Sequence, residues 1–228
     1  MAVEQFNLKT HQRAERKLLL TVAEWEDKDN GRFYIVQTKK PDNWDTNYTD
    51  YFTRTGSAEP YTYSPVESST PAPTWAASTY YTKVDRELLG RRTEDSSIEY
   101  NNDIETSTDI LGINYSDLNK TQPQQDFDPY LILGGSRLGA NLNDKRRRNA
   151  LSELSSYTLY IITAYVGDAT NGYAAEKHVD CTITYNSIGG DANVNMPISA
   201  YFSNDITLGK VDKLGDDFTF TADDTNVG

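Results

Sequence analysis

Residues 94–120 alternate between two kinds of side chain, and this alternation constrains the fold more than any other feature of the sequence. The odd positions from 95 to 109 are all acidic or small and polar, whereas the even positions from 98 to 110 include isoleucine, tyrosine and threonine, which favour strands. Successive side chains of a strand point to opposite faces. The segment is therefore predicted to be a β-ribbon with one acidic face and one half-apolar face. The acids at odd positions are Asp95, Glu99, Asp103, Glu105 and Asp109.

The acidic face has two interpretations. It is either an ordinary solvated strand face or a surface kept negative so that it does not bind a polyanion. The chain of 228 residues has a formal net charge of −12. This balance argues against a phosphate-binding surface, because affinity for nucleic acids comes mainly from lysine and arginine. The basic cluster at 145–148 follows a predicted helix, where cations oppose the helix dipole favourably.

The rest of the sequence predicts a mainly β fold with one helix. Ser136 is the expected N-cap of that helix, and Leu138 and Leu142 would share one of its faces. Asn30-Gly31 predicts a tight hairpin between the first two strands. Strands are predicted at 17–25, 33–38, 127–133, 158–167, 173–185, 194–202, 206–213 and 217–221.

Residues 39–84 are rich in proline, tryptophan and tyrosine and contain a degenerate repeat, in which 41–54 resembles 73–83. One interpretation is a small aromatic core of two stapled hairpins. The other is a carbohydrate-binding or adhesive surface, because exposed aromatic rings stack on sugars. The candidate glycan contacts are Trp44, Tyr51, Trp75 and Tyr80.

The difference in composition between residues 39–84 and the rest of the chain suggests a domain organisation. A polar arm at 1–17 precedes a main domain formed by 18–38 and 85–222, the segment 39–84 is inserted in it, and 223–228 form a tail. The start of the chain lacks an apolar core segment, so no signal peptide is expected and synthesis in a cytoplasm follows.

The sequence carries no pattern typical of an enzyme. It has two histidines without metal-ligand spacing and no Gly-x-Ser-x-Gly motif, and the glycine-rich segment 134–139 lacks the ending of a phosphate loop. The single cysteine, Cys181, excludes an intrachain disulfide and a cysteine-based zinc site, and it is expected to be buried. We expect no catalytic residue, no cofactor and no metal. A hydrolase that uses paired carboxylates would need a shielded pocket, which nothing in the sequence marks.

The order of the segments resembles the major tail tube proteins of long-tailed, non-contractile bacteriophages. The segments that carry this resemblance are RRTEDSSIEYNND at 91–103, TDILG at 108–112, NKTQPQQDFDPYLILGG at 119–135, residues 187–214 and DFTFTA at 217–222. Residues 39–84 lie outside the pattern.

The resemblance implies an antiparallel β-sandwich of two sheets with one flanking helix. It also implies hexameric rings that stack into a tube, with a long hairpin from each subunit joining a β-barrel around the bore. Double-stranded DNA would pass through this bore without specific binding. Expected partners are further copies of the chain and tape measure, tail terminator and distal tail proteins, and the expected location is the virion tail. The five odd-numbered acids would face the bore, and the candidate ring-stacking loop comprises Leu111, Ile113, Tyr115, Asp117 and Lys120.

Overall fold

The computed structural model describes residues 19–27, 31–35, 40–41, 43–57, 61–77, 79–89, 97–128, 130, 136–190 and 194–223. The protein is mainly β, its strands pair antiparallel, and the predicted class is confirmed. The chain divides into two compact units, one formed by Met1–Glu24 with Arg86–Gly228 and the other by Trp25–Asp85. The second unit begins before residue 39, where the insertion was expected. The arm 1–17 lies outside the described residues.

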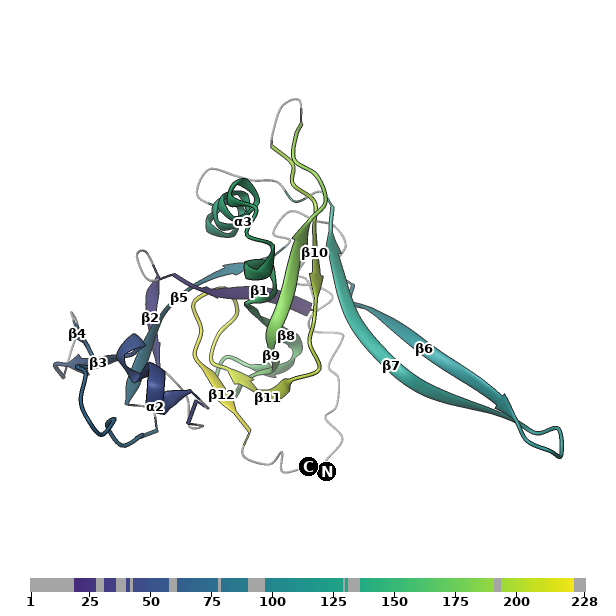
Figure 1. Cartoon of the computed structure of the whole chain (residues 1–228), viewed down its shortest axis with the longest axis horizontal. Helices are drawn as coiled ribbons and strands as arrows, with labels where there is room; N and C mark the ends of the chain where they lie inside the picture. Colours follow the sequence, from purple (N-terminus) through teal and green to yellow (C-terminus); the bar gives the residue numbers. More distant parts are fainter. Residues whose placement is uncertain are drawn as a thin grey trace. The chain divides into compact units, whose positions relative to one another are not determined.

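The strands of the first unit follow the order β1-β8-β9-β10-β7-β6, and β11 pairs with both β9 and β12 (Figure 1). Two strands, β1 and β5, carry the chain from one unit into the other. The strands are β1 (Leu19–Glu26), β5 (Tyr80–Leu88), β6 (Glu99–Thr108), β7 (Asn114–Phe127), β8 (Tyr157–Asp168), β9 (Gly172–Tyr185), β10 (Ile198–Tyr201), β11 (Ile206–Val211) and β12 (Phe220–Ala222).

Strand β9 takes part in two sets of pairings. Its residues up to Cys181 pair with β8, and those from Thr182 to Tyr185 pair with β10. Asp180, just before this change, has a φ of 54°, and the register between β8 and β9 shifts nearby. Irregularities of this kind bend a strand and increase its twist. The bend lets β9 connect the strands around β8 to the strands around β10 and β7.

The core of the first unit contains a buried ion pair. Arg86 is 5% exposed, and its guanidinium binds the Glu24 carboxylate and donates to Phe218 O at 2.7 Å. The Tyr160 and Phe218 rings lie against the same guanidinium. Removing one partner of such a pair costs about 3–5 kcal/mol. The apolar core around it comprises Val22, Tyr160, Ile162, Ala175, Val211, Phe218 and Phe220.

Helix α3 (Arg137–Arg148) begins as predicted, since Ser136 Oγ accepts a hydrogen bond from Gly139 N and both Leu138 and Leu142 are buried. The Glu87 carboxylate accepts hydrogen bonds from the backbone N–H groups of Arg137 and Leu138. A carboxylate at this end of a helix accepts hydrogen bonds from N–H groups that have no partner within the helix, and it interacts favourably with the positive end of the helix dipole.

The basic cluster 145–148 ends helix α3, as predicted. Lys145 is buried, donates to Glu153 O at 2.8 Å and lies over the Tyr157 ring. Burial lowers the pKa of this lysine. Arg148 forms ion pairs with Asp144 and Glu153. These contacts give the two cations a structural role without nucleic acid.

The second unit contains β2 (Arg32–Ile35), the short helix α2 (Trp44–Asn47), a 3₁₀ helix (Tyr48–Asp50), β3 (Phe52–Thr55), β4 (Thr62–Pro65) and the first part of β5. Strand β3 pairs with β4 and β5, and β2 pairs with β5. The sequence predicted that β2 would return along the first strand, so the partner expected from the Asn30-Gly31 turn differs from the observed one. Asp27 N donates to Lys83 O at 3.2 Å, so the chain enters and leaves this unit side by side.

Candidate functional site

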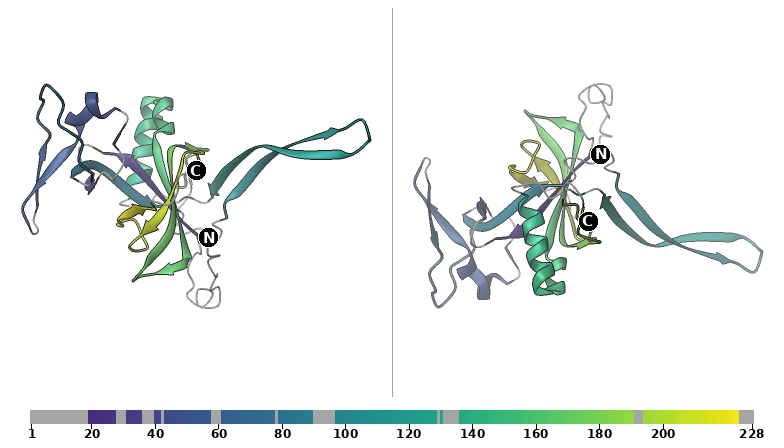
Figure 2. Two further views of the ribbon diagram at one scale, coloured as in Figure 1. Left: turned by 90° about the horizontal axis from the view of Figure 1, so that it is seen from below. Right: turned by 90° about the horizontal axis from the view of Figure 1, so that it is seen from above.

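The hairpin of β6 and β7 is the most unusual element of the first unit. The strands pair from Glu99↔Gln124 to Thr108↔Asn114, and the loop between them spans residues 109–113. Figures 1 and 2 show the hairpin extending away from the other strands of its unit. All ten residues of β6 are exposed. The ribbon predicted from the alternation is therefore confirmed over the described residues, with strand bounds that stop before the loop.

The base of the hairpin is firmly anchored. Strand β10 pairs with β7 from Ile198↔Phe127 to Tyr201↔Gln124. Gln125 is 1% exposed and accepts a hydrogen bond from Thr21 Oγ1, while Phe127 is also buried. Phe202 N donates to Pro123 O at 3.0 Å. From Thr121 to the loop, no described residue of β7 is buried. The hairpin thus has a rigid foot and a free, two-stranded extension.

The register places the two expected faces on opposite sides of the ribbon. Glu99 pairs with Gln124 and Asp103 pairs with Lys120, so the acidic face also carries one cation. A bulge at Asn119 then shifts β7 by one residue, and Glu105 pairs with residue 117. Bulges add a residue to one strand only. Alternation in β7 therefore changes phase at Asn119, which a simple count along the sequence does not reveal.

The other face of the ribbon is unusually apolar for an exposed surface. Tyr100 is 58% exposed, and the cross-strand pair Ile104↔Leu118 is 59% and 60% exposed. A two-stranded hairpin with no further layer is marginally stable in water. Its outer strand edges also present unpaired backbone groups to solvent. Both features, the exposed apolar face and the unpaired strand edges, indicate that the extension is suited to contact with another protein surface.

Asp109 organises the hairpin loop. Its Oδ1 accepts hydrogen bonds from Leu111 N at 2.8 Å and Ile113 N at 2.9 Å, and its Oδ2 accepts from Tyr115 Oη at 3.3 Å. The pKa of the Asp109 carboxyl is lowered, chiefly by the hydrogen bond from Ile113 N. Asp109 therefore acts within the loop, in addition to any role on the acidic face. The loop that it holds presents Ile110 fully to solvent.

The candidate residues of the hairpin fall into three groups. Glu99, Asp103 and Glu105 lie on β6, as predicted, and Asp95 lies outside the described residues. Leu111 and Ile113 lie in the loop. The expected stacking loop was too long, because Tyr115, Asp117 and Lys120 are residues of strand β7.

The aromatic residues of the second unit form a small core. Trp44 is fully buried, packs edge-on against Trp75 with ring centroids 4.9 Å apart, and donates from Nε1 to Pro73 O. Tyr80 is buried as well and stacks on Trp75. Trp44 and Tyr80 thus offer no exposed ring to a glycan. The two repeat copies differ in structure, since one contains α2 and β3 and the other leads into β5. They meet in one cluster instead of forming two hairpins.

We expect Trp44→Ala to lower the free energy of unfolding of the second unit by about 3–5 kcal/mol, because the substitution leaves a cavity in a core with few other members. Urea unfolding of the whole chain, followed by near-ultraviolet circular dichroism, measures the change. The half-buried Trp75 provides the matched comparison, and Trp75→Ala should cost clearly less. A loss below about 1 kcal/mol for Trp44→Ala would contradict the core assignment.

The remaining candidate chemistry is sparse. Cys181 is buried as predicted, and burial raises the pKa of its thiol. Within the described ranges, no three His, Cys, Asp or Glu side chains gather as a metal site would require. No helix in the same ranges combines the length and apolarity of a membrane span.

Comparisons of the chain with models of protein families, with curated proteins and with solved structures found no match. The geometry of the hairpin therefore supplies the main basis for a functional proposal.

Proposed function

We propose that this protein is a tube-forming subunit of a long-tailed phage, in which hairpins from six copies close into a β-barrel around a channel for DNA. The observation that carries this proposal is the long β6–β7 extension on a rigid foot, in which no described residue from Glu99 to Thr121 is buried. In the proposed fold, the strands of the first unit form a two-sheet sandwich that shares β9, with α3 at its flank.

Closure of a barrel by hairpins from several copies explains why the extension of one subunit is an isolated pair of strands. Its edges have free backbone donors and acceptors, and lateral pairing with the hairpins of neighbouring copies satisfies them. In copies related by rotation, the β6 edge of one hairpin can pair with the β7 edge of the next, so the pairing can continue around a ring until it closes. A barrel has no edge left for aggregation.

The two faces then acquire different partners. The face with Glu99, Asp103 and Glu105 lines the channel, where negative charge repels the phosphate backbone and lets DNA slide. The face with Tyr100, Ile104 and Leu118 packs against protein, which removes its apolar surface from water.

The loop and the tail partners complete the proposal. Ile110 and Leu111, which Asp109 holds at the end of the hairpin, contact the next ring. The proposed location is the virion tail, where tape measure, tail terminator and distal tail proteins bound the tube. No enzymatic step is assigned to the chain.

The purified chain tests the proposal directly. At rising protein concentration, negative-stain electron microscopy should show rings and stacked tubes with a central channel. Sedimentation should show that assembly increases with concentration. A chain that stays monomeric at millimolar concentration across salt and pH conditions, also when mixed with tail proteins of the same phage, would overturn the proposal.

A further inference from the structure

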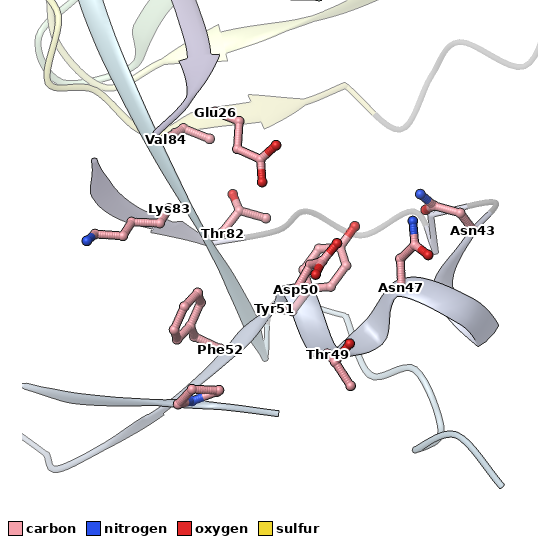
Figure 3. Close-up of a pocket in the computed structure, with 11 residues that line it drawn as sticks. Glu26, Asn43, Asn47, Thr49, Asp50, Tyr51, Phe52, Thr82, Lys83 and Val84 are labelled. Carbon is pink, nitrogen blue, oxygen red and sulfur yellow. The ribbon is translucent and has the colours of Figure 1, made fainter. Parts of the chain in front are cut away.

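The second unit contains a pocket of about 520 Å³ that the aromatic core does not fill. Its lining comes from the end of β1, from α2 and the 3₁₀ helix that follows, and from β3, β4 and β5, and all of it lies within Trp25–Asp85 (Figure 3). This volume lies within the range of about 300–1,000 Å³ that is typical of small-molecule sites. The proposed tube leaves this pocket without a role.

Two aromatic rings in the lining are held in place from behind. Tyr51 packs against Trp44 with ring centroids 5.1 Å apart, and its backbone is fixed by hydrogen bonds with Tyr48 and Val66. Phe52 packs edge-on against Phe33 at 5.0 Å. Both Tyr51 and Phe52 are half-buried, so each keeps part of its ring accessible. Rigid aromatic surfaces bind flat, weakly polar faces of ligands, such as the C–H face of a pyranose ring, at low cost in entropy.

Two amides extend the pocket beyond the rings. Asn43 and Asn47 lie one helical turn apart at α2, and Figure 3 shows both side chains on the same side of the helix. Both residues are exposed. An amide offers a donor and an acceptor at a fixed spacing, which matches two neighbouring hydroxyl groups of a sugar. A pair of amides beside aromatic rings therefore suits a polyhydroxylated ligand.

The charge of the lining restricts the ligand further. Two carboxylates, Glu26 and Asp50, and one ammonium, Lys83, line the pocket, so its charge is negative on balance. The pKa of Tyr51 is raised by burial and then by the negative charges of Asp50 and Glu26, which agrees with their closeness to the ring. Such a lining disfavours anionic glycans and accepts neutral or amine-bearing ones.

We infer that this pocket is a binding site for one or two residues of a neutral or amine-bearing saccharide, with Tyr51 and Phe52 as stacking surfaces and Asn43 and Asn47 as hydroxyl partners. Of the four glycan contacts expected from the sequence, this site keeps only Tyr51. Trp44 supports Tyr51 from within the core instead of touching the ligand. The inference does not depend on tube formation.

A glycan array with neutral, amine-bearing and anionic saccharides tests the inference on the full chain. We expect binding to a neutral or amine-bearing member, confirmed by calorimetric titration with that saccharide. The double variant Asn43→Ala/Asn47→Ala should bind about 5- to 150-fold more weakly, because two hydrogen bonds contribute about 1–3 kcal/mol. Glu67→Ala, an exposed substitution in the same unit outside the pocket, should bind like the parent.

Three results would overturn the inference. They are no binding to any array member, a preference for anionic glycans, and unchanged affinity of the double variant when its circular dichroism equals that of the parent. If the double variant loses its fold, Phe52→Leu provides the second test. This substitution keeps an apolar side chain but removes the stacking ring, so unchanged affinity would again overturn the inference. Electron microscopy of the same variants separates this outcome from any failure of tube assembly.

Discussion

Replacing residues 102–121 with Asn-Gly should abolish ring and tube formation completely while leaving the subunit folded. The new turn joins Asn101 to Gln122, which already pair across the hairpin, and Asn-Gly favours such two-residue turns. The deleted segment contributes no buried side chain among its described residues, so the free energy of unfolding should change by less than about 1 kcal/mol. Electron microscopy measures assembly, and urea unfolding measures stability. Tubes formed by the shortened chain would refute the role of the hairpin.

A second variant keeps the length of the hairpin and changes one face only. Ile104→Glu with Leu118→Glu places two like charges opposite each other on the apolar face. Assembly should be lost here as well, since a charged face cannot pack against protein. Thr106→Ser on the same face provides the matched control and should assemble normally.

In the proposed tube, reversing the charge of the acidic face should make the channel retain DNA instead of repelling it. In the triple variant Glu99→Lys, Asp103→Lys and Glu105→Lys, we expect tubes to form and to bind duplex DNA strongly at low salt. Because binding releases counterions, the bound fraction should fall steeply between roughly 50 and 200 mM salt. Co-sedimentation of tubes with DNA measures this binding. In phage that carry the variant, ejection should slow or stall.

The neutral variant Glu99→Gln, Asp103→Asn and Glu105→Gln separates charge reversal from loss of repulsion. It should bind DNA weakly, because amides neutralise no phosphate charge. Lysine-bearing tubes that release DNA as readily as the parent at every salt concentration would place these three residues away from the channel. Asp109 is left intact in both variants, because its carboxylate holds the hairpin loop.

The alternation of residues was sufficient to predict the β-ribbon and its two faces, because period-2 patterning determines which side chains share a face. It did not predict that the half-apolar face is exposed as well. It did not reveal the bulge at Asn119, since a single extra residue leaves no compositional mark. It also placed Asp109 with the strand acids by parity, although this side chain turns back to cap its own loop. Local backbone geometry decided both points.

Contacts between residues far apart in the chain could not be predicted from the sequence for a different reason. The N-cap Ser136 is a local signal and was predicted, whereas Glu87 reaches the same helix end from fifty residues earlier in the chain. The Arg86–Glu24 pair likewise joins residues far apart in sequence. The tryptophan content was consistent with a small aromatic core, which was one of the two interpretations of this segment. Whether Trp44 is buried or exposed depends on how α2 packs against β5, and composition does not determine this packing.

The hydrogen bond from Asp27 N to Lys83 O brings together the two ends of the segment that forms most of the second unit. A segment whose two ends meet can be replaced or lengthened while the residues that flank it keep their positions. The same property makes this unit a natural position for displaying a foreign domain.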